Sequence, residues 1–578
     1  MYIMKYLKLR YFGANLSIAL RTTFLFLAFV FFGSQAVGQQ LYLVAVGADN
    51  IETNAIDSVG YKKEHPNLKS VFEEANSLSD RLKKQGYFSN EVLEYKPEND
   101  STFRFNYRLG EMISSIHIYI GANPSIRKLT FPDSVSDTII TKPNTTEVLI
   151  KDALERLERS GYSLAKIELK NIEQKGNVLQ AELFVDLGNL RRVNDIVITG
   201  YEKFPQGHRK NIIRQYKNKT FNIKTLDQIS NDFKKLRFVN QTRYPEILFK
   251  KDTTKVYVYL EKAKPNRFEG FVGFANDEEE KLTFSGYLDL MLVNFLNAGE
   301  DFTLYWKSDG QEQKTFNAEL QVPYLFKSSF GIRASLNIFK QDSTFQNTRT
   351  AIGLGYYLNY NSQIFLNYEA TESSDIQNQQ LGSIADFKNA FATTQYDFTA
   401  FATEDILFPE RTSIRLKAGV GSRTSRGEKI NQQIYQVNLM HNIILNKRNQ
   451  INIRSQNFYL QSDQYLLSEL HRFGGITSIR GFNENSLQGN MLTSLLTEYR
   501  FIPTPGLYIH SILDLGYYAD ESQSQATLQN NKLLGLGLGF GLLTKNGLLN
   551  LVYANGSTDK QAIKGTNSVV HISFRTTF

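Results

Sequence analysis

The chain has 578 residues, too many for one hydrophobic core, so its length predicts several domains. It contains no cysteine, which excludes disulfides, thiolate nucleophiles and cysteine-bound metals. The net charge is +8, but Lys and Arg are scattered among Asp and Glu as on a solvated surface. This distribution argues against nucleic acid as a partner.

Residues 1–38 have the pattern of a secretory signal peptide. Basic residues precede an apolar run over 24–32, and small residues at 36–38 then suit a cleavage site. The alternative is a membrane anchor helix, but the apolar run is short for crossing a bilayer. We expect cleavage after Gly38, which removes four cations and lowers the net charge to near +4. Those cations are Lys5, Lys8, Arg10 and Arg21.

Residues 39–265 contain one unit that occurs three times, in the order strand, helices, two strands. In the first two copies a helix ends in a Gly-Tyr corner, at 86–87 and 161–162, where glycine fits a left-handed C-cap. In the third copy Leu-Arg-Phe at 236–238 replaces this corner. The opening strands are expected at 41–46, 116–120 and 193–198. We therefore place the three domains at 39–112, 113–190 and 191–265.

Residues 266–578 change to segments of about ten alternating residues separated by polar or glycine-rich turns. Alternation places one set of side chains toward lipid and the other toward a lumen, and 31 Tyr with 41 Phe can supply aromatic girdles. The Leu-Gly alternation over 534–541 is typical of a barrel strand whose glycines allow close approach. We expect 16 strands, beginning near 266, 281, 300, 314, 329, 347, 361, 386, 411, 431, 449, 490, 507, 531, 547 and 568.

The last expected strand has two distinct faces. The apolar face suits lipid, and it ends the chain on an aromatic residue. The polar face suits a wet lumen. The apolar face comprises Val570, Ile572, Phe574 and Phe578, and the polar face His571, Ser573, Arg575 and Thr577.

The sequence FGGITSIRGF at 473–482 places Arg480 on a glycine-rich loop between strands 11 and 12 of this count. Arginine offers a fork of five donors that matches carboxylates. Two acids lie on the following strands, Glu498 and Asp514, and the leucines on both sides of Asp514 turn its carboxylate inward. Arg480 can bridge the two acids. The alternative is a solvated Arg480 beside ordinary lumen residues.

The loop motif, the aromatic-ended strand and the repeated unit together resemble the outer-membrane protein assembly factors, the BamA/TamA-like superfamily that joins POTRA domains to a surface-antigen-type barrel. Segments 266–271 and 294–300 resemble the entrance of that barrel. The resemblance covers the mature chain and implies three α+β POTRA-like domains followed by a 16-stranded antiparallel transmembrane β-barrel over 266–578. It also implies that the loop folds into the lumen as a latch. The latch residues are Arg480, Gly481, Phe482, Glu498 and Asp514.

The resemblance implies a protein of the cell outer membrane whose POTRA domains lie in the periplasm. Its partners would be unfolded outer-membrane or secreted client polypeptides and outer-membrane lipids. A further periplasmic or inner-membrane partner is left open. Clients would be received on POTRA sheet edges and templated at the barrel seam. The seam residues are Phe268 and Phe271 on the first strand and Val570, Ile572, Phe574 and Phe578 on the last.

Two other functions are compatible with the sequence. One is export of a dedicated partner through the lumen, as in two-partner secretion, although three repeated domains count against it. The other is a passive outer-membrane pore with structural N-terminal domains. No Gly-x-Ser-x-Gly or His-Glu-x-x-His motif occurs, and the seven histidines are scattered. We therefore predict no enzyme, no catalytic residue, no metal site and no cofactor.

Overall fold

We analysed a computed structural model of the chain. For residues 271–276 and 282–285 it describes the backbone alone. The predicted signal peptide, residues 1–38, and the terminal Phe578 lie outside the described residues. The structure describes residues 40–276, 282–309, 313–342, 344–376, 384–401, 405, 407–522, 529–545, 547–559 and 568–577.

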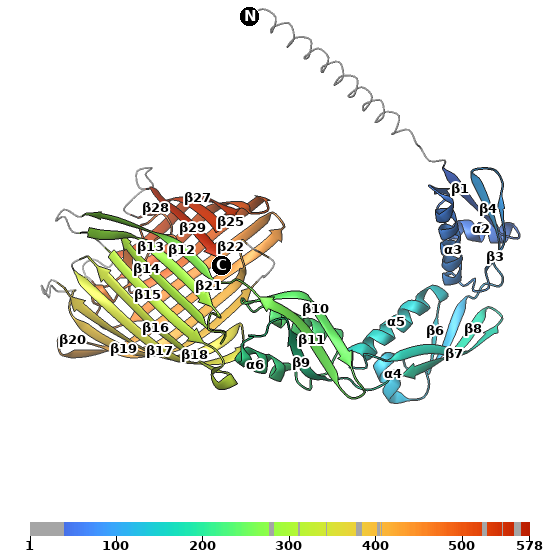
Figure 1. The fold of residues 1–578 in the computed structure, drawn as a ribbon, viewed down its shortest axis with the longest axis horizontal. Helices are drawn as coiled ribbons and strands as arrows, with labels where there is room; N and C mark the ends of the chain where they lie inside the picture. The colour runs from blue at the N-terminus through green and yellow to red at the C-terminus, as the bar shows by residue number, and fades with distance from the viewer. Residues whose placement is uncertain are drawn as a thin grey trace, which may run out of the picture. The chain divides into compact units, whose positions relative to one another are not determined.

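The first two domains each carry a four-stranded sheet with helices packed against it (Figure 1). The strand orders are β2-β1-β4-β3 and β6-β5-β8-β7, and the central pairs β1–β4 and β5–β8 are parallel. The first domain contains β1 (Leu41–Val46), α2 (Asn50–Val59), β2 (Glu64–His65), α3 (Leu68–Lys84), β3 (Glu91–Pro97) and β4 (Thr102–Arg108). The second contains β5 (Ser115–Tyr119), α4 (Pro124–Thr130), β6 (Thr138–Thr141), α5 (Pro143–Arg159), β7 (Lys166–Lys175) and β8 (Val178–Asp186).

Helix α3 forms because its sequence provides both a cap and an apolar stripe. The side chain of Asn67 accepts a hydrogen bond from the backbone N–H of Ser70 at 2.9 Å, which satisfies a free donor of the first turn. Residues at helical spacing then bury one face, namely Val71, Ala75, Leu78 and Leu82. The helix ends before Gly86, whose φ of 108° is the left-handed conformation expected at the Gly-Tyr corner.

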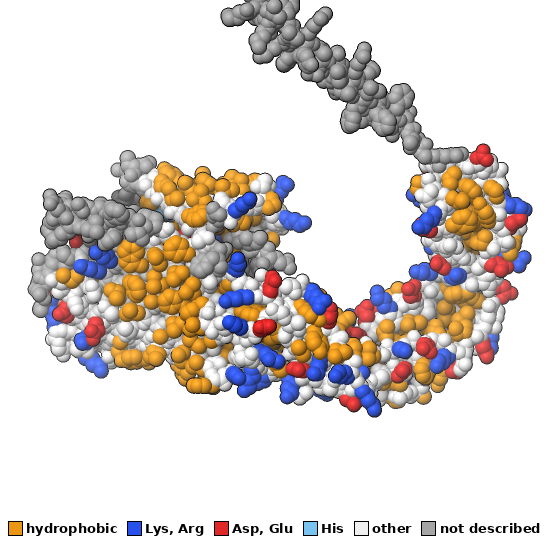
Figure 2. Space-filling view, in the orientation of Figure 1, with side chains coloured by type: hydrophobic (Ala, Val, Ile, Leu, Met, Phe, Trp, Pro, Cys, Tyr) orange, Lys and Arg blue, Asp and Glu red, His pale blue; other side chains and the backbone are white. Residues whose placement is uncertain are grey.

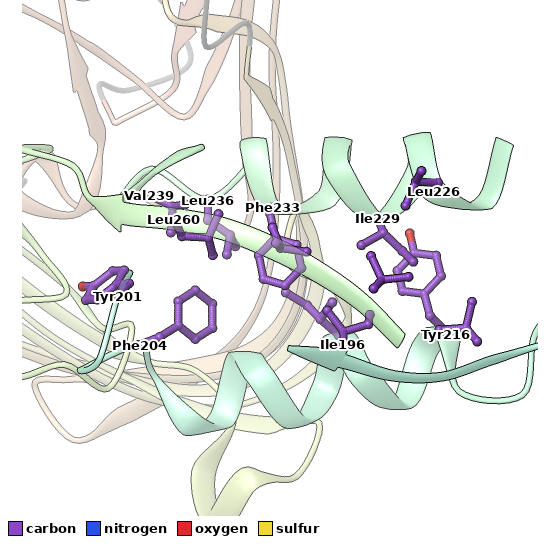
Figure 3. Close-up of a cluster of buried hydrophobic side chains, with 14 of the residues drawn as sticks. Ile196, Tyr201, Phe204, Tyr216, Leu226, Ile229, Phe233, Leu236, Val239 and Leu260 are labelled. Carbon is purple, nitrogen blue, oxygen red and sulfur yellow. The ribbon is translucent and has the colours of Figure 1, made fainter. Parts of the chain in front are cut away.

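The third domain has the order β9 (Val193–Thr199), α6 (Gln206–Tyr216), α7 (Ile223–Lys234), β10 (Val239–Phe249) and β11 (Thr254–Lys262). Its three-stranded sheet has the order β10-β11-β9. Both helices contribute to one apolar core, and Figure 3 shows Phe204 and Phe233 between the helices and the sheet. No helix in the described part of the chain is long and apolar enough to cross a membrane.

From residue 267 onward, the described residues form a closed antiparallel barrel of 16 strands, which confirms the predicted fold class. Consecutive strands pair as neighbours, and the first strand, β12, also pairs with the last, β29. The barrel strands are β12 (Arg267–Asn276), β13 (Leu282–Val293), β14 (Asp301–Asp309), β15 (Gln313–Val322), β16 (Phe330–Gln341), β17 (Phe345–Asn359), β18 (Ser362–Asp375), β19 (Phe387–Phe401), β20 (Glu410–Ser425), β21 (Glu428–Asn446), β22 (Asn449–Gln461), β25 (Met491–Thr504), β26 (Leu507–Asp520), β27 (Gln529–Thr544), β28 (Gly547–Thr558) and β29 (Ser568–Thr577).

Side chains alternate between the two faces of the barrel wall, as period-two strands require. Figure 2 shows hydrophobic side chains gathered over the outer wall. The inner face is polar, and its ion pairs include Arg333 with Asp397 at 2.7 Å and Lys417 with Glu369. This is the pattern of a barrel that crosses a bilayer around a wet lumen. Exposed outer-face residues include Ile352, Leu354, Leu366, Tyr368, Val420, Leu495, Leu513, Leu515, Leu538 and Ile572.

The third domain packs against one end of the barrel, which we call the domain-side end and define by the turns at 294–300 and 323–329. The side-chain amide of Asn294 donates to the Tyr201 hydroxyl at 2.8 Å. An ion pair of 2.7 Å joins Arg237 to Asp301. The opposite end, which carries the connection at 462–490, is called the far end. These contacts fix the third domain to the barrel mouth.

His208 on α6 is enclosed in this contact, with 1% of its surface exposed. Its ring lies edge-on to Tyr324 of the barrel turn, with centroids 4.8 Å apart. A Cβ added at Gly299 would overlap the imidazole, so the turn approaches the ring closely. Burial lowers the pKa of His208 to about 3, which keeps the imidazole neutral in the folded protein.

This burial predicts that the third domain loses stability in mild acid. The unfolded histidine titrates near 6.5, so between pH 6.5 and 3 the unfolded state binds the extra proton and folding weakens as pH falls. From pH 7.5 to 5 the expected loss is about 2 kcal/mol. Hydrogen exchange of the α6 and β9 amides in the full chain measures this loss of stability, and His208→Phe, which cannot take up the proton, is the control. Equal pH dependence of exchange in the unchanged protein and in His208→Phe would contradict the assignment of the loss to His208.

Candidate functional site: the lumenal loop and the barrel seam

The connection between β22 and β25, residues 462–490, folds against the inner face of the barrel wall. It contains a short hairpin, β23 (His471–Phe473) with β24 (Leu487–Gly489), and the 3-10 turn η2 (Leu467–Glu469). Its apolar side chains pack on Leu492 and Leu496 of β25 and on Leu533 of β27. Leu495, which lies between the two leucines along β25, is exposed on the outer face. Alternation therefore places the loop in the lumen. The cluster comprises Phe473, Ile479, Leu492, Leu496 and Leu533.

Arg480 makes a forked contact with Asp514 on β26. Its Nε donates to Oδ2 at 2.8 Å and its Nη2 to Oδ1 at 2.5 Å. Its backbone N–H adds a third bond to Oδ2 at 2.9 Å. Arg480 is 2% exposed and Asp514 is 0% exposed. The contact thus fixes both the side chain and the backbone of the loop in one position.

The remaining donor of Arg480, Nη1, reaches Glu498 on β25. Two further arginines of the wall also bind this carboxylate. Arg500 donates to its Oε2 from Nε at 2.8 Å and from Nη2 at 2.5 Å, and Arg454 donates to its Oε1 at 3.4 Å. The cluster therefore contains three guanidinium groups and two carboxylates. Removing one member leaves a buried charge without its partner, which is costly, although desolvation offsets most of what the intact cluster contributes to stability. The main effect of the cluster is therefore to fix the position of the loop.

Glycines in the loop and the wall allow this close approach. Gly481 has φ of 88°, and a Cβ there would overlap the backbone between Asn555 and Gly556 of β28. A Cβ at Gly535 of β27 would likewise overlap the carbonyl oxygen of Arg480. At Gly556 a Cβ would lie 2.7 Å from the ring of Phe482. The backbone at 480–482 therefore lies directly on β27 and β28.

Two further polar contacts hold the loop to other parts of the wall. Glu469 of η2 pairs with Arg423 of β20 and accepts from Gln432 of β21 at 2.9 Å. Glu484, after the Arg480 motif, accepts from the Tyr305 hydroxyl at 2.9 Å and pairs with Lys307. Tyr305 and Lys307 both lie on β14. The loop is thus attached to three separate sectors of the barrel.

The seam between β12 and β29 differs from the other strand junctions. Among the described residues it pairs at three positions, whereas β12 pairs with β13 from Arg267 to Asn276. The three positions lie at the domain-side end. There the Nε of Arg575 also pairs with Glu269 at 3.2 Å, and Tyr287 donates to the same carboxylate at 3.0 Å. Toward the far end, the described parts of the two strands have no pairing with each other.

The predicted seam residues are placed as follows. Phe268 pairs with Thr576 and is 39% exposed on the outer face. Val570, Ile572 and Phe574 are exposed on one face of β29, as the alternation predicts. Phe271 lies in β12 opposite Tyr287, but its side chain is outside the described part, as is all of Phe578.

The sequence predicts that Arg480, Glu498 and Asp514 meet, and the structure brings these three side chains together. Other members of the site are not predicted from the sequence, namely Arg454, Arg500, Arg423 with Glu469, and the contacts of Glu484. The two wall arginines had a usable signal, because they share the inward parity of Glu498. The Glu484 contact had none, since it depends on the path of an irregular loop.

Comparison with known proteins gave structural matches alone: no family model and no curated relative matches the chain. CdiB from Acinetobacter baumannii aligns at 13% identity with a TM-score of 0.50, over 81% of this chain and 90% of that one. At this identity the likeness is one of fold: three POTRA-like α+β domains followed by a closed antiparallel barrel of 16 strands in the described residues. CdiB from Escherichia coli (14% identity, TM-score 0.48, 88% and 98% covered) also matches. BamA from Haemophilus ducreyi lacking POTRA domains 1–3 also matches, at 14% identity with a TM-score of 0.47, over 79% of this chain and 97% of that one.

No group of three or more His, Asp or Glu side chains in the described ranges is arranged to hold a metal ion. The described residues of the site form a loop fixed by buried charges next to a strand junction that pairs at three positions. The chemistry of this arrangement is that of non-covalent strand pairing.

The buried cluster predicts a large effect of Arg480→Ala on the barrel. The change leaves Asp514 enclosed without its guanidinium, so we expect a loss of about 3–5 kcal/mol in barrel stability. Denaturant titration monitored by heat-modifiable gel mobility measures it. The matched control is Lys388→Ala, which removes an exposed wall pair with Glu372 and should leave barrel stability nearly unchanged. An Arg480→Ala protein as stable as this control would refute the latch.

Proposed function

We propose that the protein is an outer-membrane insertion and assembly factor, with its POTRA-like domains in the periplasm and its far end extracellular. The observation that carries this proposal is the β12–β29 seam. Among the described residues, β12 beyond Glu269 and β29 before Arg575 show no strand pairing with each other. A row of free strand groups is a template for pairing with another strand. A client strand would add to this edge as the wall opens.

The domain-side end of the seam is the part that separates last in this proposal. Three backbone pairs and the Arg575–Glu269 ion pair hold it closed. The same end is fixed to the third domain through Asn294 and Asp301. Opening therefore begins at the far end, where these interactions are missing from the described residues. Insertion of a client strand is completed only when the pairs at the domain-side end also separate.

Client capture is best placed on the first domain. Strand β3 is an edge of its sheet, and all its residues are exposed. Leu93, Tyr95 and the neighbouring Phe72 of α3 form an exposed apolar surface beside this edge, with the two rings 5.0 Å apart. The equivalent edge β7 of the second domain instead carries alternating Lys and Glu, a composition that discourages strand addition. An extended, aromatic-rich client segment fits β3.

Export of a partner polypeptide through the lumen is the second candidate, and a specific feature favours it. A cleft of about 1330 Å³ opens between α6, α7 and the domain-side turns of the barrel. Its lining is mixed polar and apolar, which suits an unfolded chain. The lining includes Lys219, Asn231, Lys235, Arg411, Lys447 and Gly506. The lumenal loop would have to leave its buried position for a chain to pass, so insertion at the seam is preferred.

Locking the seam tests the proposal. The chain has no cysteine, so Glu269→Cys with Arg575→Cys places a single disulfide across a directly paired position. We expect client assembly to stop when the disulfide forms and to resume under reductant. The measurement is insertion of a radiolabelled barrel client into proteoliposomes that contain the purified protein.

The control lock is Glu372→Cys with Lys388→Cys, a paired position on the opposite wall between β18 and β19. This lock should leave insertion unchanged in both redox states. Equal insertion by the oxidised and reduced seam variant would overturn the templating proposal. Inhibition by both locks would mean that general rigidity, and not the seam, is the cause.

A further inference from the structure

The lumenal loop reaches both sides of the seam within five residues. At 480–482 it lies on the C-terminal side, against β26, β27 and β28. At Glu484 it contacts Tyr305 and Lys307 of β14 on the N-terminal side. The order of strands around the wall is β28-β29-β12-β13-β14. The segment from Gly481 to Glu484 therefore spans the seam from inside the lumen.

The position of this crossing along the barrel axis complements the backbone pairing. β14 begins at the domain-side turn, so Tyr305 is its central residue and Lys307 lies beyond it toward the far end. Along the strand ladder Tyr305 is level with Glu269, the last β12 residue that pairs across the seam, and Lys307 is level with Phe271, two residues beyond it. The backbone pairs close the domain-side end of the seam, and the loop bridges it at and just beyond the last of these pairs.

We propose that Glu484 is a clasp that holds the two margins of the seam together through the lumen, and that its release from Tyr305 and Lys307 precedes opening toward the far end. The clasp deepens the proposed function and rests on it for its purpose. Whether Glu484 holds the seam closed does not depend on whether the opened seam templates a client.

The difference in burial between the two attachments sets the order of release. Arg480 and Asp514 are enclosed, with side-chain exposures of 2% and 0%. Glu484 and Lys307 are wetter, at 23% and 34%. Water competes for exposed ion pairs, so the Glu484 contact exchanges more readily than the Arg480 contact. The loop can therefore free the N-terminal margin while staying latched to the C-terminal one.

The experiment is a distance measurement across the seam in lipid nanodiscs. Leu304→Cys on β14 and Ile572→Cys on β29 provide two spin-label sites in a chain without other cysteines. Double electron–electron resonance should give one short distance population. Glu484→Gln and, separately, Lys307→Met should raise the long-distance population about two- to fivefold, the change expected from loss of a partly exposed pair.

Two further variants make the result decisive. Lys388→Met, which removes an exposed pair on the far wall, should leave the distances unchanged. The exchanged pair Glu484→Lys with Lys307→Glu should restore the short population, because it rebuilds the ion pair in reverse. Unchanged distances in both Glu484→Gln and Lys307→Met would overturn the clasp, and the second variant covers the case in which the first fails to fold.

The same proteins separate failure of the clasp from failure of the proposed function. A widened seam with no change in client insertion would refute templating and leave the clasp standing. The clasp would be refuted and templating left standing by a different pair of results. These are unchanged distances in Glu484→Gln and Lys307→Met, and insertion that the disulfide of the Glu269→Cys, Arg575→Cys protein still stops.

Discussion

The structure depends on one buried ionic interaction, the contact of Arg480 with Asp514 and Glu498. It binds a loop of irregular backbone to the inside of a barrel, together with the apolar cluster around Ile479 and the ion pairs of Glu469 and Glu484. Apolar burial has no preferred direction and does not by itself fix the path of such a loop. A forked guanidinium with two carboxylates supplies direction as well as attraction, and three bonds to Asp514 fix the loop backbone itself.

Both the strand pairing of the wall and the contacts of the loop close the barrel. A fully closed barrel has no free strand edges, and this removes the hazard of uncontrolled pairing. Here the seam is paired at its domain-side end, and the loop contacts β14 on the other side of the seam at and just beyond the last pair. In the proposed function, this arrangement keeps a strand edge available while the loop restrains it. It also links the seam mechanically to the third domain, which is fixed at the paired end.

Much of the fold could be predicted because it follows from local periodicity. The expected barrel strands begin within three residues of the observed ones, since alternation and turn residues are both written into each segment. The Gly86 corner was predictable because a left-handed cap strongly favours glycine. The inward direction of Asp514 followed from its two exposed leucine neighbours. All these inferences need at most one strand or turn at a time.

The rest could not be predicted because it depends on the path of residues 462–490. Glu469 with Arg423 and Glu484 with Lys307 join positions far apart in the sequence through a loop without periodicity. The partial pairing of β12 with β29 is likewise a property of barrel closure, not of either strand. Arg454 and Arg500 were predictable in part, because strand parity places them inside the barrel but does not show that they contact Glu498.

The central claim is that the protein assembles other outer-membrane proteins. Depleting it in its native cell and profiling the outer-membrane proteome tests that claim most directly. The account predicts that several integral β-barrel proteins fall in abundance while periplasmic proteins do not. An unchanged outer-membrane profile would contradict it, and loss of a single secreted polypeptide with all barrels retained would favour export instead.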